Sequence, residues 1–181
     1  GEQIKTTIDG RFLFGLGRNA QGFSTFIVSS PNGTQREDQY PIAERNYLIQ
    51  RVEGVPQRTV EPPAEQLQRI QSDSALVGRA RREVTDKIDF LKGFIKPLEG
   101  PKTGVYGSQR FYNGVPKSPH YGVDYAAPTG TNVRAPAAGI VRLAHRDLFY
   151  SGGTLIIDHG HGLTSSFLHL SDILVSVGSR V

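Results

Sequence analysis

Cysteine and methionine are both absent from this sequence of 181 residues. Without cysteine the chain has no thiol to protect outside the cell, which is compatible with export but does not establish it. Without methionine the chain does not begin at its own initiator, so we interpret Gly1 as a processing scar or an artificial boundary. The sequence also lacks a cationic-then-apolar leader and any run near the about 20 apolar residues of a membrane span. These absences predict that the chain as given has no transmembrane segment.

The residues that are abundant favour β-structure. There are 21 glycines and 11 prolines, which favour strands joined by many turns over a helical bundle. The length suits one domain of ordinary size plus a smaller one, and a hydrophobic fraction of 37% permits a packed core. The net charge of +4 either has no functional meaning or favours anionic surroundings such as acidic wall polymers. Because basic residues are not densely clustered with aromatic ones, nucleic acid is not an expected partner.

Three segments follow one another along the chain. Residues 1–56 are predicted to form a small antiparallel β-domain, residues 57–98 a helical connector, and residues 99–181 a second antiparallel β-region. Within the β-segments, runs of β-branched and aromatic residues are bounded by glycine, proline or asparagine. These runs predict strands at 11–16, 23–28, 47–52, 138–143, 154–158, 164–168 and 173–175.

The connector has the apolar spacing of a helix. Pro62 and Pro63 suit its first turn, where a missing N–H is tolerated. Apolar residues then recur at steps of three and four from Leu67 to Leu91. Gly78 costs about 1 kcal/mol relative to alanine, so two shorter helices are an alternative to one long helix. We interpret the many arginines here as a solvated face, with contact to an acidic polymer as the alternative.

His120 and Asp124 are candidate metal ligands. Neutral imidazole and carboxylate both suit zinc, and the two residues are four positions apart. Four steps of a straight strand cover about 13 Å, which leaves little room for both side chains to meet on one ion. Gly122 lies between them, so the pattern predicts a bend or bulge near this glycine. Taken alone, the pair is weak evidence for a metal site, and two hydrogen-bonded loop residues are the favoured interpretation.

The surrounding residues resemble a known family. The run from Ser118 to Val141, SPHYGVDYAAPTGTNVRAPAAGIV, resembles the first signature of the LytM/lysostaphin-type zinc metallopeptidases, peptidase family M23. The run from Gly153 to Ser171, GTLIIDHGHGLTSSFLHLS, is similar to that family's central hairpin. The resemblance extends from about residue 104 to the end of the chain. Residues 107–114 look like the lead-in of exported members that carry an N-terminal β-domain.

This resemblance implies a zinc metallo-endopeptidase that hydrolyses peptide bonds of bacterial peptidoglycan, in cross-links or stem peptides. It places the protein in the periplasm or cell envelope. It implies Zn2+ as the cofactor, His120 and Asp124 as metal ligands, and His169 as a catalytic histidine near the reacting water. Histidine exchanges protons near neutral pH, which suits that role.

The expected C-terminal antiparallel β-sheet metallopeptidase domain is incomplete in this chain. The family's third ligand and second catalytic histidine belong to a His–x–His motif that the sequence does not reach. The local run from His159 to His161 also spells His–x–His, but we interpret it as polar residues of a tight turn.

Two other functions remain open on the sequence. One is a non-catalytic protein of the M23 fold that binds the cell wall or regulates another wall hydrolase. The other is a plain carbohydrate-binding β-module, which accounts for the turns and the charge but not for the pairing of His120 with Asp124.

Overall fold

The computed structural model describes residues 3–57 and 61–181. The N-terminal residue interpreted above as a boundary, and residues 58–60 of the predicted connector, lie outside the described residues. In chain order, the strands are β1 Phe23–Ser29, β2 Gln35–Pro41, β3 Ile49–Val52, β4 Lys102–Gly104, β5 Gln109–Tyr112, β6 Val115–Pro116, β7 Asp124–Tyr125, β8 Ile140–Leu148, β9 Gly152–Gly160 and β10 Leu163–Leu170. The helices are the 3-10 turn η1 Ala64–Gln66, the α-helix α2 Leu67–Arg82 and the 3-10 turn η2 Asp89–Lys92.

The predicted mainly β architecture is confirmed. The strands form a two-stranded sheet β1-β2, a three-stranded sheet β10-β9-β8, a three-stranded sheet β3-β5-β6 and a two-stranded sheet β4-β7. All these pairs are antiparallel except β3 and β5, which run parallel. Among the described residues no helix is long and apolar enough to cross a bilayer.

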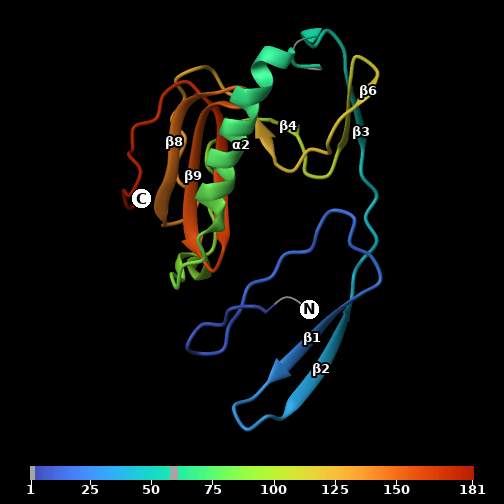
Figure 1. Ribbon diagram of the computed structural model, residues 1–181, viewed down its shortest axis with the longest axis vertical. Coiled ribbons are helices and arrows are strands. Elements are labelled where there is room, and N and C mark those ends of the chain that lie inside the picture. The colour runs from blue at the N-terminus through green and yellow to red at the C-terminus, as the bar shows by residue number, and fades with distance from the viewer. Residues whose placement is uncertain (1–2, 58–60) are drawn as a thin grey trace.

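The β1-β2 hairpin extends away from the rest of the molecule (Figure 1). Its turn falls at the predicted Pro31–Gly33, where Gly33 has a φ of 86°. The strand expected at 11–16 is wrong, because Phe12 makes only an isolated bridge to Thr6. Aromatic packing holds this segment instead, with the ring of Phe12 5.7 Å from that of Phe26. The polar strand β2 was not predicted, since its sequence QREDQYP carries little of the usual strand signal.

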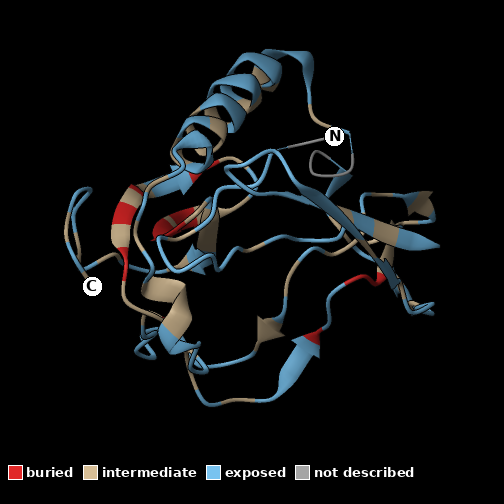
Figure 2. Ribbon diagram, turned by 90° about the horizontal axis from the view of Figure 1, so that it is seen from below, coloured by how far each residue is buried: buried red, intermediate tan, exposed pale blue. Residues whose placement is uncertain are grey.

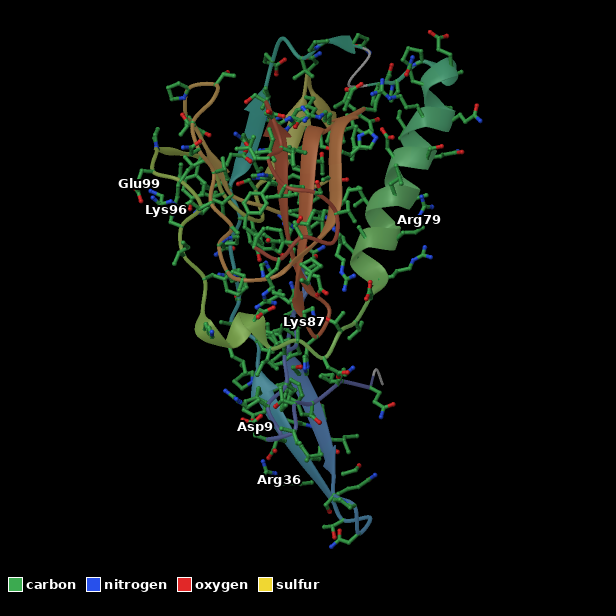
Figure 3. All side chains as sticks on the ribbon, turned by 90° about the vertical axis from the view of Figure 1, so that its left-hand side faces the viewer. Asp9, Arg36, Arg79, Lys87, Lys96 and Glu99 are labelled. Atoms are coloured by element: carbon green, nitrogen blue, oxygen red, sulfur yellow. The ribbon has the colours of Figure 1, made fainter. Side chains whose placement is uncertain are left out.

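The main hydrophobic core lies between α2 and the β10-β9-β8 sheet (Figures 1 and 2). Buried residues concentrate in β8 and β9. Leu143, Leu148 and Ile156 form the buried cluster against which the helix packs. Three partly buried apolar side chains of the helix, Leu76, Val77 and Ala80, pack against this cluster. Arg79 points away from the sheet (Figure 3), as expected of a solvated face.

The helix ends earlier than its apolar spacing suggested. It stops at Arg82, and Glu83 is extended with a ψ of 121°. The following segment crosses the turn between β9 and β10, where the Thr85 hydroxyl donates to Asp158 at 3.0 Å. The Thr85 carbonyl accepts from the His161 N–H at 2.9 Å. The apolar residues after Arg82 therefore belong to an irregular segment and to η2. In this conformation Thr85 forms hydrogen bonds with β9 and with the turn after it, which it would lose if the helix continued. No strand forms at the expected 173–175.

Candidate metal centre

The backbone bends between the two candidate ligands. Gly122 is the centre of a bend, and only Asp124 and Tyr125 belong to a strand, β7. The predicted bend near Gly122 is therefore confirmed, and His120 and Asp124 do not lie on one straight strand. As a result the two side chains turn toward each other across the loop.

His120 and Asp124 are in direct contact. The His120 Nε2 atom lies 2.9 Å from Asp124 Oδ1. The other ring nitrogen, Nδ1, lies 3.2 Å from the Val105 carbonyl oxygen, which only accepts hydrogen bonds, so Nδ1 carries the donor proton. In a neutral imidazole Nε2 is then an acceptor facing a carboxylate oxygen, which is another acceptor. With Nδ1–H directed at the Val105 carbonyl, a second proton on Nε2 or a metal ion between the two atoms makes this contact favourable.

The spacing of this donor pair fits a metal ion. With Zn–N and Zn–O bonds of about 2.0–2.2 Å, two ligands of a tetrahedral zinc lie about 3.3 Å apart. A shift of a few tenths of an ångström separates the observed 2.9 Å from that value. The Nδ1–H to carbonyl hydrogen bond is also the usual partner of a metal-ligating histidine. Within the described residues, however, no group of three or more His, Asp or Glu side chains is arranged to hold a metal ion.

The pair lies against β4 and opens toward solvent on the Asp124 side. Side-chain exposure is 12% for His120 and 46% for Asp124. In the β4-β7 pair, Gly104 is opposite Asp124. A Cβ on Gly104 would overlap the Asp124 carboxylate and lie 3.0 Å from His120 Cε1. The absence of a side chain at this position therefore makes room for both candidate ligands.

Arg110 on β5 holds the second oxygen of the Asp124 carboxylate. Its Nη2 donates to Asp124 Oδ2 at 2.7 Å. Its Nε donates to Gln50 Oε1 at 3.1 Å, and its Nη1 lies 3.4 Å from the Tyr112 hydroxyl. The guanidinium is thus oriented by two neighbours while it binds the carboxylate.

The loop that carries the Val105 carbonyl is supported by the N-terminal segment. The Arg18 Nε donates to the Gly107 carbonyl at 2.6 Å. The ring of Tyr47 packs on Gly107, and the Arg18 guanidinium lies 4.3 Å from the centre of that ring. On the other side the Gly107 N–H donates to the His120 carbonyl at 2.7 Å. Residues far apart in the sequence therefore fix the position of the His120 ring.

His169 lies on β10, in a different sheet from the pair. It has a positive φ of 60° within an irregular stretch between Phe167 and Leu170, and its N–H donates to the Ser151 carbonyl at 2.9 Å. Such irregularities re-aim side chains at functional sites. Its side chain is exposed, and no hydrogen bond or ion pair between described residues joins it to His120 or Asp124. Its catalytic role stays a prediction.

The local His–x–His run divides into two different environments. His159 is fully buried in β9, and its ring nitrogens lie 2.7 Å from the Ala138 carbonyl oxygen and 2.8 Å from the Ser165 hydroxyl. It is a core residue rather than the turn residue that the sequence suggested. His161 does lie in the turn, with a φ of 51° and its ring against Phe90. Because both nitrogens of His159 are engaged, the run is not arranged as a metal site.

Sequence reasoning assigned no role to Arg110, Gln50 or Gly104. Arg110 falls in the lead-in at 107–114, which was noted only for its resemblance. The signal for Gln50 is absent from the local sequence, because it arises from the parallel pairing that sets Gln50 opposite Arg110.

Comparisons with known proteins find relatives of this chain. The model of peptidase family M23 matches residues 118–181. Peptidoglycan DD-endopeptidase ShyA of Vibrio cholerae is 41% identical over 64 residues, which cover 35% of this chain and 15% of that protein. DD-carboxypeptidase/endopeptidase Mpg of Neisseria meningitidis is 44% identical over 52 residues, or 29% of this chain and 12% of that protein. The chain thus spans only a small part of the length of these curated relatives.

A solved structure matches almost the whole chain. It is a crystal structure of a protein from Pseudomonas aeruginosa assigned to peptidase M23, with a TM-score of 0.67 and 28% identity. The match covers 97% of this chain and 66% of that one.

The antiparallel sheets and the paired histidine and aspartate define a mainly β domain with a candidate metal centre. Together with these matches they assign residues 118–181 to peptidase family M23, and the chain as a whole has the fold of the matched M23 structure.

Proposed function

We propose that this chain is part of a zinc metallo-endopeptidase that hydrolyses peptide bonds of bacterial peptidoglycan, in cross-links or in stem peptides. The observation that carries the proposal is the 2.9 Å contact between His120 Nε2 and Asp124 Oδ1, which brings one nitrogen and one oxygen donor to a spacing that suits a shared metal ion. Membership of family M23 supports a peptidase, and the names of the relatives support the substrate class. The same relatives support a location in the periplasm or cell envelope.

The chain's own residues would bind the metal through one nitrogen and one oxygen. His120 would contribute Nε2, since its Nδ1 is held by the Val105 carbonyl. Asp124 would contribute Oδ1, since its Oδ2 accepts from Arg110. When bound, zinc supplies a Lewis acid that polarises a carbonyl and activates water for hydrolysis.

His169 would act on the proton of the reacting water. An exposed imidazole whose ring is not engaged by hydrogen bonds among the described residues is available to accept a proton and to donate it later to the leaving amine. The 46% exposure of Asp124 leaves the pair open on the side from which a peptide would approach.

Digestion of purified peptidoglycan by the full-length protein tests this function. We expect release of cleaved peptides that a chelator abolishes and added zinc restores. His120→Ala and Asp124→Ala should lower both zinc content and peptide release, whereas His169→Ala should keep most of the zinc and lose at least about a hundredfold in rate. His161→Ala is the matched control, since its ring lies in the turn after β9, and it should retain activity.

Each contrary result has a definite meaning. Binding to peptidoglycan without chelator-sensitive cleavage would replace the proposal with the non-catalytic member of the fold. Wild-type zinc content in both His120→Ala and Asp124→Ala would remove these residues from the site.

A further inference from the structure

The guanidinium of Arg110 is held from three directions. It binds Asp124 Oδ2 at 2.7 Å, Gln50 Oε1 at 3.1 Å and approaches the Tyr112 hydroxyl at 3.4 Å. Its side chain is 21% exposed, about half the exposure of the Asp124 carboxylate. The guanidinium is planar and rigid, so the hydrogen bond from Nε to Gln50 fixes the directions of the other N–H groups. One of these, on Nη2, points at the Asp124 carboxylate.

This contact decides which carboxylate oxygen faces His120. With Oδ2 occupied by the Arg110 N–H, Oδ1 is the oxygen that lies 2.9 Å from His120 Nε2. A charge-assisted hydrogen bond of 2.7 Å is among the stronger and more directional contacts in proteins. Asp124 would therefore bind a metal through one oxygen in a fixed orientation, and rotation of the carboxylate would require that bond to break.

The support for Arg110 comes from the N-terminal part of the chain. Strand β3 pairs in parallel with β5, and in that register Gln50 is directly opposite Arg110. Both residues precede the segment 118–181 that matches the family model. The upstream strand thus reaches the candidate metal centre through a single relay: Gln50 orients Arg110, and Arg110 orients Asp124.

We propose that Arg110 is a positioning residue for the metal ligand Asp124, and that Gln50 acts through Arg110. The inference rests on the proposed zinc site and adds to it a function for β3: the strand pre-orients the carboxylate before the metal binds. Outer contacts of this kind contribute about ten- to a hundredfold in metal affinity. In this proposal neither residue is itself a metal ligand.

Zinc titration of the full-length apoprotein against a chromogenic chelator tests the proposal. We expect Arg110→Ala to weaken zinc binding about ten- to a hundredfold and Gln50→Ala to weaken it less. Arg110→Lys, which keeps the charge but not the fork of donors, should recover part of the affinity. In the Arg110→Ala background, Gln50→Ala should cause no further loss, because the glutamine has nothing left to orient.

Arg51→Ala is the matched control. Arg51 is the next residue of β3, its guanidinium lies over the Phe111 ring at 4.6 Å, and its side chain does not contact Asp124. We expect this variant to keep wild-type zinc affinity. The cobalt(II) absorption spectrum of each variant gives a second measurement, since a changed orientation of Asp124 alters the ligand field whereas a general loss of stability does not.

The outcomes separate this inference from the proposed function. Wild-type zinc affinity in Arg110→Ala, or an equal loss in Arg51→Ala, would overturn the positioning role while leaving the zinc site in place. An independent further loss from Gln50→Ala in the double variant would overturn the relay. If the wild-type protein bound no zinc, the proposed function itself would fail and this inference with it. If Arg110→Ala did not fold, Gln50→Ala and Arg110→Lys would decide the question by the same titration.

Discussion

The histidines of this chain differ in what their ring nitrogens contact. His159 has both nitrogens within hydrogen-bond distance of protein oxygen atoms and is fully buried. His120 has one nitrogen held by a carbonyl oxygen and the other facing a carboxylate. His169 is exposed and adopts a positive φ of 60°. A buried histidine whose two ring nitrogens both contact neutral protein oxygen atoms contributes to the stability of the fold. A histidine with a ring nitrogen that faces solvent or a carboxylate is suited to bind a metal or to exchange a proton.

Replacement of His159 should therefore reduce stability without affecting zinc. His159→Ala removes a buried ring and leaves the Ser165 hydroxyl and the Ala138 carbonyl without this partner. The expected cost is about 2–4 kcal/mol in the free energy of unfolding, measured by urea denaturation. His161→Ala, in the turn that follows, should cost less than about 1 kcal/mol. Equal costs for the two variants, or a weaker zinc affinity in folded His159→Ala, would contradict this assignment.

At the scale of elements, short strands assemble the candidate metal centre. Strand β7 carries Asp124 and pairs with β4, while β5 carries Arg110 and pairs with β3. The β4-β7 pair leaves no space for a side chain at Gly104, because a Cβ there would overlap the Asp124 carboxylate. If the pair binds a metal as proposed, a single added carbon atom on β4 should alter the metal affinity, although β4 contributes no ligand.

Gly104→Ala should accordingly weaken zinc binding by at least about tenfold, because Asp124 must move to accommodate the new methyl group. The matched control is Gly78→Ala in α2, where an added Cβ would meet nothing within 4 Å. That variant should keep zinc affinity and gain up to about 1 kcal/mol in stability from its better helix propensity. Titration of both variants with zinc, together with urea denaturation, measures the two effects. Unchanged zinc affinity in Gly104→Ala would show that the strand tolerates the methyl group.

The elements also show which parts of the structure were readable from the sequence. The bend at Gly122 and the parts of β8, β9 and β10 that overlap the predicted 138–143, 154–158 and 164–168 correspond to local patterns of glycine and β-branched residues. The continuation of β8 to Leu148 runs through the charged residues 145–147 and has no such pattern. The pairing of β3 with β5 was not readable, because parallel pairing joins residues about sixty positions apart and leaves no local mark. The end of α2 at Arg82 likewise depends on contacts with residues distant in the sequence. The apolar spacing continues beyond it, but contacts with the sheet prevail.

For the candidate site, residue types were readable and their supports were not. His120 and Asp124 stand out through the resemblance of the surrounding run to the family signature, and the bend between them corresponds to Gly122. The partners of these two residues, the Val105 carbonyl and Arg110, become visible only once β4, β5 and β7 are assembled. A backbone carbonyl has no signature in the sequence at all.

At the scale of the whole molecule, the segment after α2 contacts both β9 and the stretch that contains Arg180. Its Thr85 hydroxyl binds the buried Asp158 carboxylate of β9. Further along, η2 contributes Asp89, whose carboxylate accepts from Arg180 at 2.6 and 2.8 Å. Arg180 in turn belongs to the stretch that pairs with the start of β8 through Ile140. The connector therefore lies against the outside of the sheet, and the Asp89–Arg180 pair joins η2 to the stretch beside β8.

This ion pair should make stability depend on pH in the acid range. The hydrogen bond from Arg180 holds the pKa of Asp89 below its usual value, so the unfolded chain binds this proton more tightly than the folded protein does. The stabilisation is then complete above the unfolded-state pKa of about 3.9 and is lost as the pH falls through the lower folded-state pKa. Because Arg180 is largely exposed, we expect Asp89→Asn to cost only roughly 0.5–1 kcal/mol at pH 7. The same variant should flatten the fall of the unfolding free energy below about pH 4.

Urea denaturation between pH 2.5 and 7 measures both effects. Arg180→Ala should reproduce the loss at pH 7, and the double variant should add little to it, because the two side chains contribute through one shared contact. Since the pair links η2 to the strand-forming stretch beside β8, its loss should also increase hydrogen exchange of the backbone amides at Val141 and Val181, which pair with Ser179 and Gly139. Additive losses in the double variant, or an unchanged acid slope in Asp89→Asn, would mean that the Asp89–Arg180 contact does not contribute to the stability of the fold.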